Sequence, residues 1–305
     1  MANITAAQAS TGKTDTLRGV AFMIAATLIF SAQDGLSKAL AEDHPAIFVT
    51  LWRYWAFGAV CLLLLWRTGF KKGLASGQPR LQIARGVLLA LQICVAITAF
   101  AINGLAPSHA VFAFVPLLVV GLSGPVLGEK VGWRRWSAVG VGMIGMLLII
   151  RPGSQPLTPG ILLTMLAACM FAAYQLMTRR VARTDAAMTS FYYTGLAGAA
   201  AMTFIGPWFW SSFTPFEVLL LVILCISGMT GHLMLIKAFE AAEASAIQPF
   251  SYLQTVAAST IGVVVFGEVM SRWTVLGGAI VISAGLFAFW RERVRAKAAA
   301  EAATR

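Results

Sequence analysis

The chain has 305 residues, of which 59% are apolar and only 11% are Asp, Glu, Lys or Arg. A soluble domain carries about 25% charged residues, so this composition excludes both a water-soluble fold and intrinsic disorder. It predicts a polytopic membrane protein, in which the net charge of +11 reports orientation in the membrane and does not indicate nucleic-acid binding.

Ten apolar runs of spanning length follow one another along the chain. Backbone exposed to lipid must satisfy its own hydrogen bonds, so we expect each run to form a helix. A spanning helix takes about 20 residues, and ten of them leave no room for a folded domain outside the membrane. The runs cover residues 17–40, 46–66, 81–102, 108–127, 132–150, 160–180, 187–209, 216–237, 245–267 and 272–290.

The distribution of basic residues predicts the orientation. With the N-terminus in the cytoplasm, 19 Lys and Arg residues fall on the cytoplasmic side and three, Lys38, Arg151 and Arg272, on the outer side. The positive-inside rule then places both termini in the cytoplasm. Residues 1–16 are expected to form a polar cytoplasmic N-terminus, and residues 291–305 a basic tail that contacts anionic lipid.

Cofactor chemistry has little support in the sequence. The four cysteines lie inside apolar runs without the spacing of a disulfide framework or a metal site. Nucleotide-binding and dinucleotide-binding motifs do not occur. We therefore expect no metal and no cofactor, and transport driven by a gradient of protons or of the substrate itself.

The two halves of the chain align with each other. A shift of 139 residues superposes Gly128-Glu129 on Gly267-Glu268, and a shift of 141 residues superposes Gly19 on Gly160, Phe30 on Phe171, Ala32 on Ala173 and Lys38 on Arg179. Because five helices are an odd number, the second copy would enter the membrane from the opposite side. The sequence thus predicts an all-α polytopic membrane protein with ten transmembrane helices, in two inverted five-helix repeats (17–151 and 152–290) around a central cavity.

Two tandem five-helix units that each end their fourth helix in Gly-Glu resemble the drug/metabolite transporter superfamily, in its EamA-type branch. The residues that carry this resemblance are Phe30 to Lys38, Trp52-Arg53-Tyr54, Gly231-His232 through Phe239, Pro249 and Tyr252. They are most similar to the YddG-type amino-acid exporters. The resemblance implies ten helices in a basket around a cavity, and export of small metabolites across a bacterial inner membrane.

Asp34 and Arg53 are ionisable residues inside predicted spans, where charge is costly and usually functional or paired. At 1.5 Å per residue both lie about 10 Å below the outer surface. We expect an Asp34–Arg53 ion pair, shared with Lys38. It would either lock the first two helices together or face an outer vestibule and attract a zwitterion, and snorkelling of the side chains to the interface is the third alternative.

Proline inside a span marks a helix whose freed backbone groups line a cavity or contact neighbours. Pro116 and Pro249 fall in the fourth helices of the two repeats, and we interpret them as hinges of broken helices. Polar and aromatic residues near these prolines, together with others on the first, third, sixth and eighth predicted helices, are candidates for a substrate-binding cavity, with mutual packing of the helices as the alternative role. The candidates are Phe30, Gln33, Gln92, Phe112, Tyr174, Gln175, His232, Gln248, Tyr252 and Gln254.

Enzyme activity is a distant alternative. Gly121-Leu122-Ser123-Gly124 matches the GxSG pattern of intramembrane serine proteases, with His232 as a base. In a chain with 28 glycines such a match is expected by chance, and a protease would leave the repeat unexplained. His232 is also interpreted as a packing residue or as a proton-coupling group.

The sequence therefore favours a secondary transporter that exports amino acids by alternating access and is not an enzyme. The alternative substrates are a nucleoside, a flavin or a cationic drug. The expected partners are the small-molecule substrate and the lipid bilayer, without nucleic acid, and the monomer is expected to function alone.

Overall fold

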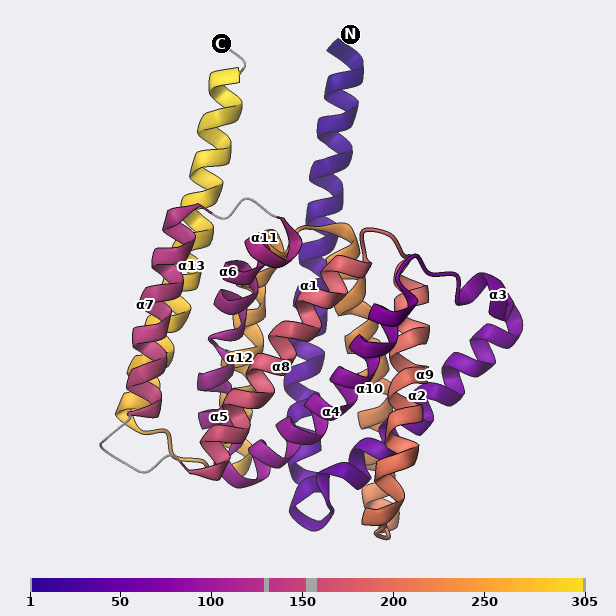
Figure 1. Cartoon of the computed structure of the whole chain (residues 1–305). Coiled ribbons are helices and arrows are strands. Elements are labelled where there is room, and N and C mark those ends of the chain that lie inside the picture. The colour runs from indigo at the N-terminus through magenta and orange to yellow at the C-terminus, as the bar shows by residue number, and fades with distance from the viewer. Residues whose placement is uncertain (1, 129–131, 152–157, 304–305) are drawn as a thin grey trace.

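The computed structural model describes residues 2–128, 132–151 and 158–303, and these form helices joined by short connections (Figure 1). Within these ranges no strand occurs. The helices are α1 (Ala2–Asp43), α2 (Ala46–Thr68), α3 (Phe70–Gly73), α4 (Pro79–Asn103), α5 (Leu105–Phe112), α6 (Val115–Leu127), α7 (Trp133–Ile150), α8 (Pro159–Val181), α9 (Ala187–Ile205), η1 (Gly206–Phe209), α10 (Pro215–Ala241), α11 (Ala244–Ile247), η2 (Gln248–Ser251), α12 (Tyr252–Phe266) and α13 (Arg272–Ala303).

Seven segments of the described chain are long and apolar enough to cross a membrane, and each covers one of the predicted runs. Two shorter apolar helices, Trp136–Ile150 and Arg272–Phe287, match two more runs. The remaining run, 187–209, corresponds to the 19-residue α9 followed by η1. The helical class is confirmed, while the count of ten membrane crossings stays a prediction. Helix α1 already begins at Ala2 and α13 continues to Ala303, so both expected polar tails are helical.

The helix ends follow local sequence signals. Proline occupies the first turn of α4, α8 and α10, where the missing N–H costs nothing. Gly128 and Gly267 end α6 and α12 with φ of 70° and 64°, a left-handed conformation that favours glycine. The same cap therefore occurs at both glycines of the repeated Gly-Glu motif.

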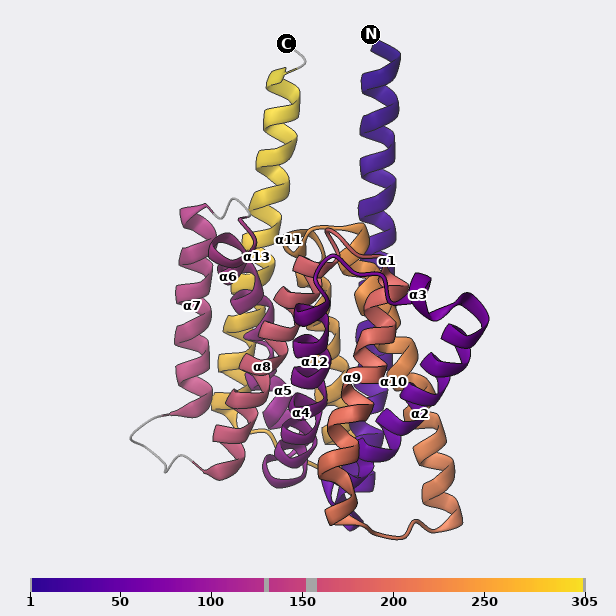
Figure 2. The same cartoon turned by 45° about the vertical axis from the view of Figure 1, so that its right-hand side comes forward.

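The two halves pack in a reciprocal manner. Helix α1 packs against α10, and α8 packs against α4, so the first helix of each half lies on the third long helix of the other. Helices α2 and α9 contact each other, and α7 and α13 stand side by side at one edge of the bundle (Figure 2). This pairing is what an internal two-fold relationship between the halves would produce.

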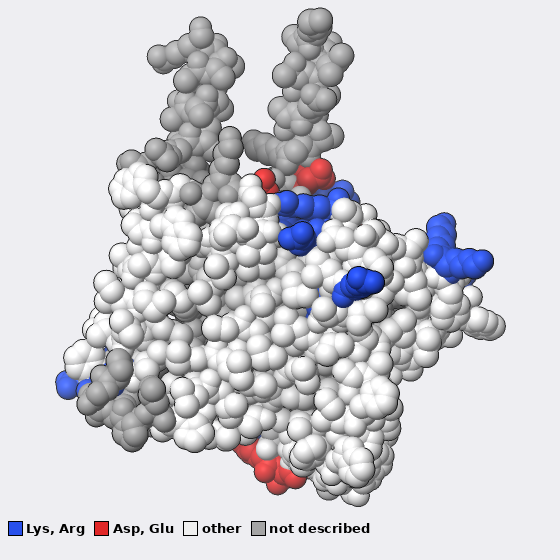
Figure 3. Space-filling view, in the orientation of Figure 1, with Lys and Arg blue, Asp and Glu red and all other residues white. Residues whose placement is uncertain are grey.

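Both chain ends leave the bundle from one face, here called the terminal face (Figure 1). The opposite end of the bundle, where α1 ends and α2 begins, is the distal face. Most of the basic side chains in this view lie toward the terminal face, and acidic ones are visible at both faces (Figure 3). The orientation of the chain in a membrane stays a prediction.

The two prolines coincide with interruptions of helices. The segment Leu105–Leu127 breaks at residues 113–114 into α5 and α6, and Pro116 lies in the first turn of α6. Pro249 lies in the 3₁₀ turn η2 between α11 and α12. The broken helices predicted from the prolines are therefore present, and their role as hinges stays a prediction.

A buried ionic latch joins the two halves at the distal face. The Lys38 ammonium pairs with the Glu268 carboxylate, which also accepts hydrogen bonds from the backbone N–H groups of Leu105 and Ala106 at 2.8 and 2.7 Å. Glu268 thus caps the first turn of α5. Its counterpart Glu129 lies outside the described residues.

The latch stabilises the charged form of Glu268. Burial raises the pKa of this carboxyl group, but the Lys38 ammonium and the two backbone amides outweigh burial and hold the pKa below its ordinary value. Because the pKa is lowered in the folded state, the stabilisation is complete above the ordinary pKa and is lost as the pH falls below it.

We expect Glu268→Gln to lower the melting temperature of the detergent-solubilised protein by several degrees, because it leaves Lys38 without its partner. Glu42→Gln, at an exposed position of the same face, is the control and should change it little. The difference between Glu268→Gln and wild type should shrink in thermal melts below about pH 4. Equal melting temperatures of the two variants at pH 7 would show that the latch contributes nothing.

Candidate functional site

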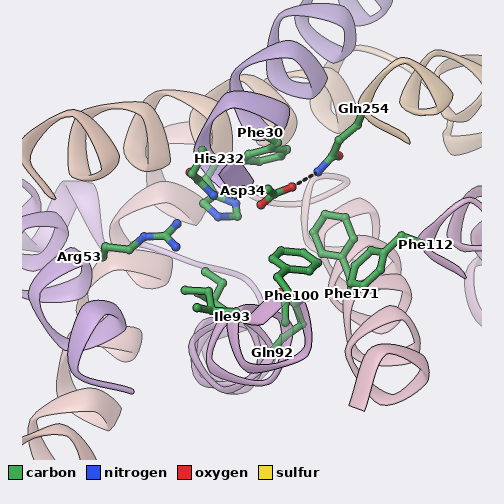
Figure 4. A pocket seen from close by; sticks show the side chains of 13 residues that line it. Phe30, Asp34, Arg53, Gln92, Ile93, Phe100, Phe112, Phe171, His232 and Gln254 are labelled. Atoms are coloured by element: carbon green, nitrogen blue, oxygen red, sulfur yellow. Dashed lines mark hydrogen bonds between the residues drawn. The ribbon is translucent and has the colours of Figure 1, made fainter. Parts of the chain in front are cut away.

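A cavity lies between helices of both halves (Figure 4). The most polar part of its wall comes from α1, where Phe30, Gln33 and Asp34 share one helix face because they are three and four residues apart. The other lining residues are Arg53 from α2, Gln92, Ile93, Ala96, Ile97 and Phe100 from α4, Phe112 from α5, Phe171 from α8, His232 from α10 and Gln254 from α12.

Aromatic rings form a connected arc, and all of its members except Tyr174 line this cavity. Phe100 and Phe112 have ring centroids 5.9 Å apart, Phe112 and Phe171 6.4 Å, and Phe171 and Tyr174 6.1 Å. The arc continues from Tyr174 to His232 at 6.0 Å and from His232 to Phe30 at 4.9 Å. Aromatic faces attract cations and stack on flat rings, so the arc suits a ligand with either feature.

Arg53 forms the positive side of the cavity. Among the described residues its one hydrogen bond, from Nη1 to the Ser37 hydroxyl, is long at 3.5 Å. Gly228 of α10 leaves room for the Arg53 and Gln33 side chains, because a Cβ at this position would lie 3.1 Å from Gln33 Oε1 and 3.3 Å from Arg53 Nη2. Gln33 Oε1 and both ring nitrogens of His232 are buried without a hydrogen-bond partner. This side therefore offers donors and acceptors that the protein itself does not use.

Asp34 forms the negative side, and its contacts correct our expectation of an ion pair with Arg53. Its Oδ2 accepts a hydrogen bond from Gln254 Nε2 at 2.9 Å and lies 3.2 Å from His109 Nε2. No ion pair joins Asp34 to Arg53 in the described chain, and Figure 4 shows the carboxylate turned toward Gln254. Depth along two helices fixes the height of a residue but not the direction of its side chain. Lys38, expected to share the pair, contacts Glu268 instead.

Six of the ten predicted cavity residues line the cavity: Phe30, Gln33, Gln92, Phe112, His232 and Gln254. Four do not. Gln175 accepts a hydrogen bond from Gln248 Nε2 at 2.6 Å, so these two amides satisfy each other. Tyr252 packs against Gly285, and Tyr174 lies behind Phe171 and His232, fully buried.

Two lining aromatics were missed although the sequence holds a signal for each. Phe100 lies eight residues after Gln92 and therefore on the same face of α4. Phe171 is the counterpart of Phe30 at the 141-residue shift, so the repeat itself identifies it.

Arg85 is a third charged side chain inside the bundle. It is fully buried in α4, where its Nη2 donates to Gln82 Oε1 (2.8 Å), the Ser190 carbonyl (2.6 Å) and Thr194 Oγ1 (2.8 Å). Its Cζ also lies 5.4 Å from the centre of the Tyr174 ring. Arg85 thus joins α4 to α8 and α9 on the terminal side of the cavity.

Asp185, in the turn between α8 and α9, connects this network to the terminal face. Gln82 Nε2 and the Gly77 N–H both donate to it at 2.8 Å, and the Ser76 hydroxyl donates as well. Burial raises the pKa of Asp185, but these hydrogen bonds outweigh burial and hold its pKa below the ordinary value.

The protease alternative finds no support in this geometry. The Ser123 hydroxyl donates to the carbonyl of Val120 at 2.8 Å, one turn back in its own helix. His232 contacts Phe30 and Tyr174, and neither of its ring nitrogens has a hydrogen-bond partner.

The cavity between two packed halves is the architecture of a secondary transporter. The model of the EamA-like transporter family matches residues 17–151 and again residues 158–290, so the chain belongs to this family, with one copy in each half. The resemblance to the drug/metabolite transporter superfamily is thereby confirmed.

Characterised relatives are similar over most of their length. The S-adenosylmethionine uptake transporter of Rickettsia prowazekii is 26% identical over 91% of this chain and 94% of its own. The riboflavin transporter of Vibrio cholerae is 27% identical (87% and 91%), and the pseudopaline exporter of Pseudomonas aeruginosa 26% (87% and 94%). A solved structure with 20% identity and a TM-score of 0.63, covering 88% of this chain and 94% of its own, supports the fold alone.

We expect a double-mutant cycle on unfolding free energy to separate the two possible partners of Asp34. Asp34→Asn combined with His109→Gln should show a coupling of about 1 kcal/mol or more, because the two groups are in contact. Asp34→Asn combined with Arg53→Met should be additive within about 0.5 kcal/mol. A larger coupling of Asp34 with Arg53 than with His109 would support the ion pair that the sequence predicts.

Proposed function

We propose that this protein is a secondary transporter for a zwitterionic metabolite that carries an amino-acid group together with a cationic or flat ring system, of which S-adenosylmethionine is the leading example. One observation carries the proposal: a guanidinium and a carboxylate face one cavity without pairing, with an aromatic arc along its wall.

The chemistry of each side matches one part of such a substrate. Arg53 has only a weak partner within the protein and would bind a carboxylate. Asp34 lies beside Phe30 and Gln254 and would bind an ammonium or sulfonium group. The rings of Phe100, Phe112 and Phe171 would hold the cationic centre or stack on a planar base.

The named substrates of the relatives fit this class to different degrees. The one from Rickettsia prowazekii transports a sulfonium amino acid, whereas a flavin would use the aromatic arc and neither charge. Export of plain amino acids, which the sequence favoured, is the second candidate, because a simple zwitterion would also use both Arg53 and Asp34.

The mechanism we propose is alternating access between two inverted repeats of five spans each, with both termini in the cytoplasm. The reciprocal packing of α1 on α10 and of α8 on α4 supports it, as do the two broken helices and the basic terminal face. Relatives include both uptake proteins and an exporter, so we assign no direction.

The direct test uses purified protein in liposomes that contain or face labelled S-adenosylmethionine, riboflavin, and a neutral and an aromatic amino acid. We expect S-adenosylmethionine to move fastest. Movement of amino acids alone would favour the second candidate, and movement of riboflavin alone would contradict the role of both charges.

We expect Arg53→Met to weaken binding of S-adenosylmethionine at least about tenfold, because a charge-assisted hydrogen bond contributes about 1.5–3 kcal/mol. Gly228→Ala should weaken it as well, since the new methyl group displaces Arg53 or Gln33. Gly140→Ala, where a Cβ meets open space on α7, is the matched control. Equilibrium binding to the three variants measures this, and unchanged affinity in Arg53→Met would refute the assignment.

A further inference from the structure

We infer that Asp34 and His109 form a proton-binding site at the cavity wall, so that a cationic substrate and a proton compete for it and transport is coupled to proton exchange. The inference rests on the proposed function, in which Asp34 binds the cationic part of the substrate. It adds the proton as a second ligand of Asp34. It also gives a role to His109, which does not line the cavity.

The geometry of the pair is the first argument. His109 is 1% exposed and lies behind Asp34 on α5, with Nε2 at 3.2 Å from the carboxylate Oδ2. Among the described residues this nitrogen is buried without a hydrogen-bond partner, and the acidic group that it contacts is Asp34. A proton on Nε2 would therefore be held by Asp34, and Asp34 is in turn accessible from the cavity.

Electrostatics supplies the second argument. An unpaired carboxylate inside a span is costly, and in the described part of the chain Asp34 accepts a hydrogen bond only from the uncharged Gln254 amide. Histidine is the side chain that most readily supplies a positive charge near neutral pH. A substrate cation arriving at Asp34 would replace that charge, and repulsion would release the proton from the imidazole into the cavity.

The other charged groups around the pair are already occupied or distant. Lys38 and Glu268 hold each other at the start of α5. Arg53 and His232 face the cavity from α2 and α10, and Figure 4 shows the His232 ring between Arg53 and Asp34. From α4 and α8 the cavity receives Gln92, Phe100 and Phe171, which do not titrate. Toward α7 and α13, α5 presents the apolar Ala110 and Val111.

His44 provides a matched control. Its Nε2 also lies 3.2 Å from a carboxylate oxygen, that of Glu217, but this pair sits at the distal face beside Phe213 and Phe48, away from the cavity. His44→Asn therefore removes an imidazole–carboxylate contact of the same length without touching the proposed site.

The test measures proton release and binding together, on the detergent-purified full chain in weakly buffered solution. S-adenosylmethionine and a panel of organic cations are added at several pH values, and a pH-indicator dye counts the protons. We expect about one proton released per cation bound in wild type and in His44→Asn, with affinity rising up to about tenfold per pH unit. His109→Gln should bind without releasing a proton and without this pH dependence.

Each outcome is decisive. Binding to wild type without proton release would overturn the proton site and leave the proposed function intact. Proton release that persists in a folded His109→Gln protein would overturn the assignment to His109. If none of the cations binds, the proposed function and this inference fail together, because both place a cation at Asp34.

Discussion

The structure depends on the cost of charge in a low-dielectric interior, where each ionised side chain needs a partner. Lys38 and Glu268 neutralise each other over the first turn of α5, and Arg85 is surrounded by five oxygen acceptors from α4, α8 and α9. Both arrangements join helices of the two halves, one on the distal and one on the terminal side. Charge neutralisation therefore ties the halves together at both ends.

Between these two sets of contacts, the cavity leaves its own charges incompletely satisfied. Arg53 has one long hydrogen bond, His232 has none, and Asp34 is held by an amide and faced by an imidazole. Such a site is unfavourable in an empty protein, and it gains most when a ligand brings the complementary charges. The need to neutralise buried charge, which stabilises the bundle at its two ends, thus also determines which ligands the cavity can bind.

Periodicity and proline made the long helices and their two interruptions predictable, because both signals are local. The cavity was predictable where helical spacing or the repeat placed residues on one face, as for Phe30, Gln33 and Gln92. The partner of Asp34 was not, because similar depth on two helices leaves the side-chain direction open. The burial of Arg85 was not predictable either, because it lies within two turns of the start of α4 and is buried only by the packing of α8 and α9.

The central claim is that a zwitterionic substrate lies between Arg53 and Asp34, within the aromatic arc. A cryo-electron microscopy structure of the protein with bound S-adenosylmethionine tests this most directly. The account predicts ligand density in the cavity, with the carboxylate within hydrogen-bonding distance of the Arg53 guanidinium and a cationic centre beside Asp34. Density elsewhere, or in the cavity with both charges still contacting only protein, would contradict it.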